Sequence, residues 1–446
     1  MDKVNKMPIK HILGYGTAAL GYNFVFMLTS TYVNIFFTNV LGISLAAVGI
    51  IMLVARIWDG VNDPIMGSLV DKTNTPRGKY RPYLLWGMLP LAITTILLFY
   101  SPSLGETGNI IYGAIIYILW GMSYTFANIP YMSMQSTLSF DPDERTKIIT
   151  LKNIFTVFGI ILCSMIVPGI AITKNGVHSE GFFVSGIIGA LLVIVCMGIT
   201  YKSTEKYKFI ESKKQDKITI KERVSAVVDN KALILLALSL LILSIQQALI
   251  GASNYFFVDV LKRGDVVMIY TLTGSFAMII SMVFMPIVMK LEKKTIMGVG
   301  MIIYAVASIV FYIIPDNNIA GFIIFNIIRG IGSGFSMIII WSMIADSVDY
   351  ATLKTGKQQG GIVFSTSTFM QKAAGGIGGA LINFMLAIIG FVPNAQSQTA
   401  SAGNGVKLLI SIVPAILALI VAILIILKYP LTKAKMKDIQ KKLGRA

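Results

Sequence analysis

Two acidic residues, Asp59 and Asp63, lie inside a hydrophobic segment and are four positions apart. On a helix this spacing places both carboxylates on the same face. A charged side chain at membrane depth costs at least about 2.5–3.5 kcal/mol, so two stacked acids require compensation. The pair therefore predicts a bound cation, a bound proton, or ion pairs with basic residues that face the same interior.

Oxygen atoms that could complete a cation site lie close to these acids in the sequence or at a similar depth. Asn62 precedes Asp63, and Thr125 lies at similar depth in a later hydrophobic stretch. A hard monovalent cation prefers several oxygen ligands, so Asp59, Asp63, Asn62 and Thr125 together predict a Na⁺ site. Burial and the like-charged neighbour would also favour a proton on either acid, which leaves H⁺ as the alternative.

Three basic residues are expected within the membrane-spanning stretches: Arg56, Arg329 and Lys372. Arg56 and Lys372 could neutralise the two acids in a purely structural cluster. Lys372 has no acid near it in the sequence, so we expect it to pair with the acids across the bundle and couple the cation site to the substrate. Arg329 is expected either to bind an anionic group of the substrate or to brace helix ends.

The composition is that of a membrane protein. Of the 446 residues, 55% are hydrophobic and only 13% are charged. Hydrophobic stretches of spanning length begin near residues 13, 44, 83, 109, 148, 181, 231, 266, 295, 319, 360 and 405. These stretches are too long, and alternate too little, for membrane strands. We therefore expect an all-α membrane protein with twelve transmembrane helices.

The net charge of +17 is unevenly distributed along the chain. If the N-terminus is cytoplasmic, about 31 of the 38 Lys and Arg residues fall in the termini and inward loops, as the positive-inside rule requires. This pattern predicts a plasma-membrane protein with both termini in the cytoplasm. Attraction of the basic tail to anionic lipid headgroups is sufficient to explain the remaining charge, and nucleic-acid binding is not expected.

A Lys- and Glu-rich segment divides the chain. The expected organisation is an N-terminal six-helix bundle over residues 1–200, a cytoplasmic linker over 201–230, a C-terminal six-helix bundle over 231–428, and a basic cytoplasmic tail over 429–446. Charged motifs after the fourth and tenth stretches echo one another. Two related six-helix halves are expected of the major facilitator fold, in which a central site lies between rocking halves.

The loop after the second stretch contains Asp71, Arg77, Gly78 and Lys79. This group resembles the cytoplasmic loop signature of major facilitator transporters. It would form a conformational latch that closes in one state and breaks in the other. The alternative is an ordinary basic loop that ends a helix.

Polar and aromatic side chains within the stretches could bind the hydroxyl groups and ring faces of a sugar. For any one of them, hydrogen bonding between helices is the alternative role. The candidate substrate-binding residues are Asn23, Tyr32, Tyr124, Asn128, Lys152, Asn153, Gln246, Gln247, Asn254, Arg329 and Thr368.

Several motifs together resemble the glycoside–pentoside–hexuronide:cation symporters. They include the block Trp58-Asp59-x-x-Asn62-Asp63-Pro64, the segment Asn128-Ile-Pro-Tyr131, and Lys372 on the eleventh stretch. The resemblance covers nearly the whole chain. It implies that Asp59 and Asp63 bind the coupling cation, that Asn62 and Thr125 are accessory ligands, and that Lys372 has the coupling role of that family's lysine.

The departures from the family pattern concern the sugar. Members that carry melibiose have sugar-binding aspartates on the first and fourth helices, where this chain has Asn23 and Asn128. Asn153 stands where those members have an arginine, and Met132 where an aromatic residue is expected. The resemblance therefore favours a pentoside, such as a xyloside, or a hexuronide over an α-galactoside.

These observations lead to the expectation of a symporter that imports a glycoside with Na⁺ or H⁺. The rivals are an exporter or lipid transporter on the same scaffold, an α-galactoside symporter, and a transport-dead membrane sensor. No enzyme activity is expected, because no nucleophile, catalytic metal-ligand set or phosphate loop accompanies the acids. No cofactor is expected other than the coupling cation, which would be Na⁺ at Asp59 and Asp63 or H⁺. The expected partners are the small-molecule glycoside, the monovalent cation and the lipid bilayer, with a functional monomer.

Overall fold

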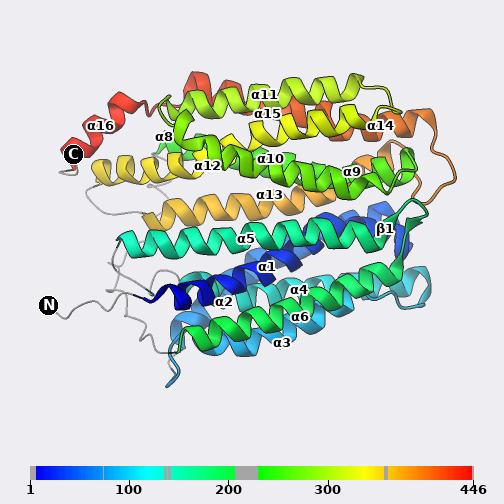
Figure 1. The fold of residues 1–446 in the computed structure, drawn as a ribbon, viewed down its shortest axis with the longest axis horizontal. Helices are drawn as coiled ribbons and strands as arrows, with labels where there is room; N and C mark the ends of the chain where they lie inside the picture. Colours follow the sequence, from blue (N-terminus) through cyan, green and yellow to red (C-terminus); the bar gives the residue numbers. More distant parts are fainter. Residues whose placement is uncertain are drawn as a thin grey trace. The chain divides into compact units, whose positions relative to one another are not determined.

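The structure is a computed structural model that describes residues 7–73, 75–134, 138, 142–205, 230–355 and 360–443. Within these ranges the chain is helical, apart from loops and one hairpin formed by β1 (Ile172–Thr173) and β2 (Gly176–Val177). The chain divides into two units, which Figure 1 shows as sets of long helices. One unit is Met1–Gln215 with Lys262–Met268, and the other is Asp216–Leu261 with Ile269–Ala446. The linker expected over 201–230 falls mostly outside the described residues.

The N-terminal unit has six long helices: α1 (Ile9–Ile35), α2 (Leu45–Lys72), α3 (Arg81–Leu98), α4 (Gly105–Met134), α5 (Pro142–Ala171) and α6 (Ser179–Ser203). Helix α1 packs against α5 and α6, and α4 packs against α2 and α3. A Cβ atom on Gly159 would overlap the Leu20 carbonyl oxygen, so glycine lets α5 approach α1 closely. Gly264 lies against the Thr173 carbonyl oxygen of the hairpin.

The C-terminal unit begins at α8 (Lys231–Leu249), which Asn230 caps by accepting a hydrogen bond from the Leu233 amide. It continues through α9 (Ser253–Tyr255), α10 (Val266–Val288), α11 (Lys293–Ile313), α12 (Ile319–Thr355), α13 (Gly360–Ile388), α14 (Ala400–Ile410), α15 (Ile412–Lys428) and α16 (Lys433–Lys442). Helix α11 packs against α12 and α15, and α8 packs against α13.

The long helices correspond to the expected hydrophobic stretches. Among the described residues, eleven helical segments are long and apolar enough to cross a membrane. Helix α13, with 29 residues, occupies the place of the remaining stretch. In lipid every backbone polar group must be satisfied internally, and continuous helices achieve this. The prediction of an all-α membrane fold is confirmed.

The first candidate membrane span of each unit, Ile9–Val40 and Lys231–Val260, ends in the same way. Phe36–Val40 (η1) follows α1 and Phe256–Val260 (η3) follows α9, and both are π-helical. A residue with positive φ follows each of them, Gly42 at 65° and Lys262 at 55°. The two segments, Phe-Phe-Thr-Asn-Val and Phe-Phe-Val-Asp-Val, are also alike in sequence. This repeat of the two units was not predicted from the sequence.

The basic tail forms the amphipathic helix α16, which packs against α12. Met436 and Ile439 are buried in the core cluster of the C-terminal unit, and Thr432 caps the helix by accepting from the Lys435 amide. The Lys435 ammonium lies 5.9 Å from the centroid of the Tyr350 ring. The tail is therefore a packed element of the C-terminal unit, and the lysines of α16 are exposed.

Candidate functional site

The two acids of α2 lie beside α4 and have different partners. Arg56 Nη1 lies 2.9 Å from Asp59 Oδ2, and Arg56 Nη2 donates to the Tyr117 hydroxyl over 3.4 Å. The Thr125 hydroxyl donates to Asp63 Oδ1 over 3.0 Å. The side chains of Arg56 and Asp59 are only 27% and 20% exposed, so the ion pair is partly desolvated. Helix α4 thus supplies hydroxyl groups to the surroundings of both acids.

Gly121 and Asn62 complete the surroundings of the acids. A Cβ atom on Gly121 would lie 3.2 Å from Asp59 Oδ1, so the glycine gives the carboxylate room beside α4. Asn62 is 8% exposed, and its Nδ2 atom has no hydrogen-bond partner among the described residues. A buried amide donor without a partner costs about 1–3 kcal/mol.

The lysine expected to couple the two sites is placed only by its backbone. Lys372 and Thr368 lie in α13, but their side chains are outside the described part of the structure. The side chain of Asp71, in the last turn of α2, is also outside the described part of the structure. The rest of the expected latch is described: Arg77 is exposed, Gly78 has φ +96° in a turn closed by Thr75, and Lys79 lies 5.5 Å from the Tyr80 ring centroid.

A polar group joins α1 and α5. Asn23 Nδ2 donates to the Ala19 carbonyl over 2.7 Å and to the Thr156 hydroxyl over 3.2 Å. Lys152, one helical turn before Thr156, is 8% exposed, and its ammonium lies 3.5 Å from Met132 Sδ. Asn153 is exposed and Asn128 is half-buried. The structure thus brings Asn23 and Thr156 into contact and places Lys152 beside Met132.

Aromatic rings surround Tyr124 on α4. Its ring centroid is 5.3 Å from that of Trp120, which is stacked on it, and 5.6 Å from that of Phe26. Trp120 is held in place because its Nε1 donates to the Thr95 hydroxyl over 3.1 Å. Phe26 is 44% exposed, whereas Tyr32 is fully buried with its ring 6.5 Å from that of Phe182. Tyr124 and Phe26 therefore form an aromatic surface next to Asn23.

The candidate substrate-binding residues of the C-terminal unit are far in the sequence from Asn23, Phe26 and Tyr124. Gln246 and Asn254 are buried at 3% and 1% exposure, and Gln247 is exposed. Among the described residues no group bonds Gln246 Oε1.

Arg329 is buried in the C-terminal unit at 2% exposure. Its Nη2 atom donates to the Tyr304 hydroxyl over 3.0 Å and to the Ile410 carbonyl over 2.9 Å. Ile410 is the last residue of α14, and Ser411 separates α14 from α15. The guanidinium therefore binds a carbonyl at a helix break, which is the geometry of a brace.

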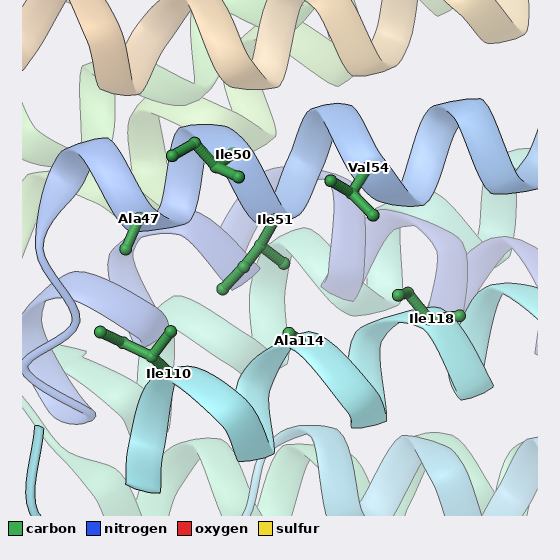
Figure 2. A pocket seen from close by; sticks show the side chains of 7 residues that line it. All are labelled: Ala47, Ile50, Ile51, Val54, Ile110, Ala114 and Ile118. Atoms are coloured by element: carbon green, nitrogen blue, oxygen red, sulfur yellow. The ribbon is translucent and has the colours of Figure 1, made fainter. Parts of the chain in front are cut away.

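The described surface also carries apolar hollows between α2 and α4. One, of about 260 Å³, is lined entirely by Ala, Val and Ile side chains (Figure 2): Ala47, Ile50, Ile51, Val54, Ile110, Ala114 and Ile118. A second, of about 380 Å³, lies next to it and is lined by Val54, Ile57, Trp58, Val61 and Ile118. A sugar needs convergent polar groups, so these hollows are not its binding site.

Comparison with known proteins identifies the family. The family described as MFS/sugar transport protein matches residues 14–433. The chain belongs to this family. The transporter is 31% identical to the symporter YjmB of Bacillus subtilis over 97% of its own length and 94% of that protein. It is 30% identical to the isoprimeverose transporter of Lactiplantibacillus pentosus, over 91% and 85% of the two chains. The resemblance to the glycoside–pentoside–hexuronide symporters is confirmed, and the protein is a transporter, not an enzyme.

Solved structures agree on the fold. A bacterial homologue of the human lysosomal transporter Spinster, in an inward-facing conformation, aligns with a TM-score of 0.69 over 98% of both chains. The identity is 13%, so this likeness establishes only the fold of the transporter. The predicted major facilitator fold is confirmed.

Four residues of the site were not singled out from the sequence: Phe26, Tyr117, Gly121 and Thr156. Phe26 follows Asn23 by three positions and Thr156 follows Lys152 by four, which are spacings that share a helix face. These spacings could have indicated Phe26 and Thr156 as candidate residues of the site. The contact between α1 and α5 could not have been inferred, because periodicity gives the face of a helix but not its neighbour.

Proposed function

We propose that the transporter imports a glycoside together with a monovalent cation, Na⁺ or H⁺, by alternating access across the cell membrane. Asp59 and Asp63 would bind the cation, with Asn62 and Thr125 as accessory oxygen ligands and Lys372 as the coupling residue. A carboxylate pair beside a hydroxyl and an amide is a suitable donor set for Na⁺. Both termini would lie in the cytoplasm, in agreement with the charge distribution.

The observation that supports the proposal best concerns two adjacent residues of α4. Thr125 contacts the proposed cation site, and Tyr124 belongs to the aromatic surface next to Asn23. Thr125 donates to Asp63, and Tyr124 packs against Phe26 and Trp120. A cation that draws Thr125 toward Asp63 would therefore also fix the position of Tyr124. By linkage, a sugar bound against Tyr124 must strengthen cation binding by the same factor.

The substrate class proposed is a pentoside, such as a xyloside, with a hexuronide as the alternative. Asn23 and Asn128 provide amides, and Met132 provides no ring for stacking. A relative that transports isoprimeverose, together with these residues, supports a xyloside over an α-galactoside.

The test is uptake of labelled xylosides, glucuronides and melibiose into membrane vesicles under an imposed Na⁺ or proton gradient. We expect gradient-driven accumulation of one glycoside class in the wild type and loss of it in Asp59→Cys and Asp63→Cys. Both variants must insert normally, as judged by their amount in the membrane. Normal accumulation in both variants would disprove the cation site, and no accumulation of any glycoside in the wild type would disprove the function.

A further inference from the structure

Three lysines of α16, drawn in red in Figure 1, form a row on the surface of the C-terminal unit. Lys433, Lys437 and Lys441 are spaced by four positions, so they lie on one face of the helix, and all three are exposed. Among the described residues no acidic side chain forms an ion pair with any of them, whereas Lys442 lies 2.7 Å from Asp438. The lysine row therefore carries three positive charges that no described acid neutralises.

Packing fixes the position of the lysine row. Tyr429 and Leu431, in the short connection from α15 to α16, are 5% and 4% exposed and belong to the core cluster of the C-terminal unit. The buried residues of α16 belong to the same cluster. The Lys433 ammonium donates to the carbonyl of Lys290 over 3.4 Å, which ties the start of α16 to the turn between α10 and α11. The lysines are therefore presented on a docked helix.

The lysine row begins close to the end of a membrane-spanning segment. The segment Ala400–Lys428 is long and apolar enough to cross a membrane, and Lys433 follows it by five positions. Leu427, in the last turn of α15, and Leu291, in the turn between α10 and α11, are 74% and 55% exposed. Exposed apolar side chains at the end of a spanning helix are covered by lipid, and basic side chains beyond them reach the headgroups. The lysine row thus lies at the level of the headgroups.

We propose that Lys433, Lys437 and Lys441 form a site for the phosphate groups of anionic phospholipids. A lysine ammonium is a compact charge with three donors, and it binds phosphate oxygens through charge-assisted hydrogen bonds. The site differs from the general attraction of a basic tail to a membrane, because the docked helix holds the three charges at a fixed spacing. The proposal goes beyond sugar transport and does not depend on which sugar or cation the transporter carries.

Lipid bound at this site would also stabilise the contact of α16 with α12. The two helices pack against each other, and Lys435 lies above the Tyr350 ring of α12. A ligand that binds only when α16 is docked stabilises the docked state. Phosphatidylglycerol should therefore raise the midpoint of thermal unfolding, whereas zwitterionic phosphatidylcholine should not. A midpoint that does not rise would contradict this stabilisation.

The test uses the full chain in a neutral maltoside detergent, titrated with phosphatidylglycerol or with phosphatidylcholine. Native mass spectrometry counts the lipids that remain bound at each concentration. A lysine near an anionic surface strengthens binding about fivefold, so the triple variant Lys433→Gln, Lys437→Gln and Lys441→Gln should bind phosphatidylglycerol at least about tenfold more weakly. Its binding of phosphatidylcholine should be unchanged. Replacing the same three lysines by arginine keeps the charge and should preserve the binding of phosphatidylglycerol.

A matched control removes the same charge from another part of the chain. Lys10, Lys72 and Lys202 are exposed near the ends of α1, α2 and α6, and replacing all three by Gln lowers the net charge equally. We expect this control to bind phosphatidylglycerol as the wild type does. An equal loss in the two glutamine variants, or no loss in either, would overturn the site. Displacement of phosphatidylglycerol by an equal concentration of inorganic phosphate would overturn the assignment to a lipid, because the site would then prefer a soluble anion.

Ile439→Ser distinguishes a docked helix from a basic tail. It removes an apolar anchor that is 2% exposed and leaves every lysine in place. We expect the preference for phosphatidylglycerol over phosphatidylcholine to fall at least about threefold, because the lysines lose their fixed spacing. An unchanged preference would show that the charge of the tail alone is sufficient, and would overturn the docked site.

Discussion

Arg56 forms an ion pair with Asp59, one helical turn further along α2, at 2.9 Å. Asp63, the second acid of the same face, instead accepts a hydrogen bond from Thr125. The two carboxylates are therefore not equivalent in this structure. For Asp59 to bind a cation through both oxygens, its bond to Arg56 must lengthen or break, so the basic residue and the cation compete for the same carboxylate.

Neutralising either acid should abolish coupled transport, and neutralising Asp59 should also lower stability. Asp59→Asn and Asp63→Asn should both abolish cation-driven accumulation. Asp59→Asn also leaves the partly buried Arg56 without its counter-charge, which should cost about 1–3 kcal/mol. In Asp63→Asn the amide oxygen can still accept from Thr125. The midpoint of thermal unfolding in detergent should fall by several degrees in Asp59→Asn. An unchanged midpoint in Asp59→Asn would contradict the stabilising role of its ion pair with Arg56.

Removing the guanidinium of Arg56, which competes with Na⁺ for Asp59, should strengthen Na⁺ binding. A partly exposed ion pair contributes about 0.2–1 kcal/mol, so Arg56→Gln should raise the affinity for Na⁺ about two- to fivefold. Calorimetric titration of the purified protein with Na⁺ measures this change. Arg263→Gln removes an exposed pair with Asp265 at 2.9 Å and serves as the control, with unchanged affinity expected. Weaker Na⁺ binding in Arg56→Gln would show that Arg56 supports the site rather than competing with the cation.

A methyl group at position 121 should disturb the cation site without unfolding the protein. In Gly121→Ala the new Cβ atom would lie 3.2 Å from Asp59 Oδ1, a distance that requires the carboxylate to move by a few tenths of an ångström. Because Arg56 holds the other oxygen, we expect Na⁺ affinity to fall about three- to tenfold. Gly198→Ala on α6, where a Cβ atom would meet nothing within 4 Å, is the matched control. Equal affinities in the two variants would exclude a role for Gly121.

The sequence was sufficient to predict the helices but not their contacts. Spanning helices follow from the length of apolar runs, because lipid requires about twenty apolar residues per helix. The pairing of Asp59 with Arg56 also follows from spacing on one helix. The contact of Asn23 with Thr156 depends on how α1 and α5 pack, which no spacing within one segment reveals. The docking of α16 was missed because its two buried residues, Met436 and Ile439, lie among lysines.

The contacts of Arg329 could not be predicted from the sequence either. From the sequence it could bind an anionic substrate or brace helix ends, and the structure bonds it to Tyr304 and to the carbonyl of Ile410 at the break before α15. Arg329→Lys keeps the charge but cannot reach both partners, so one buried group loses its bond at a cost of about 1–3 kcal/mol. We expect a lower midpoint of thermal unfolding with unchanged xyloside affinity in the folded protein. Arg263→Lys, at an exposed site, should leave both quantities unchanged. A normal midpoint together with weakened binding of glucuronides alone would instead assign Arg329 to an anionic substrate.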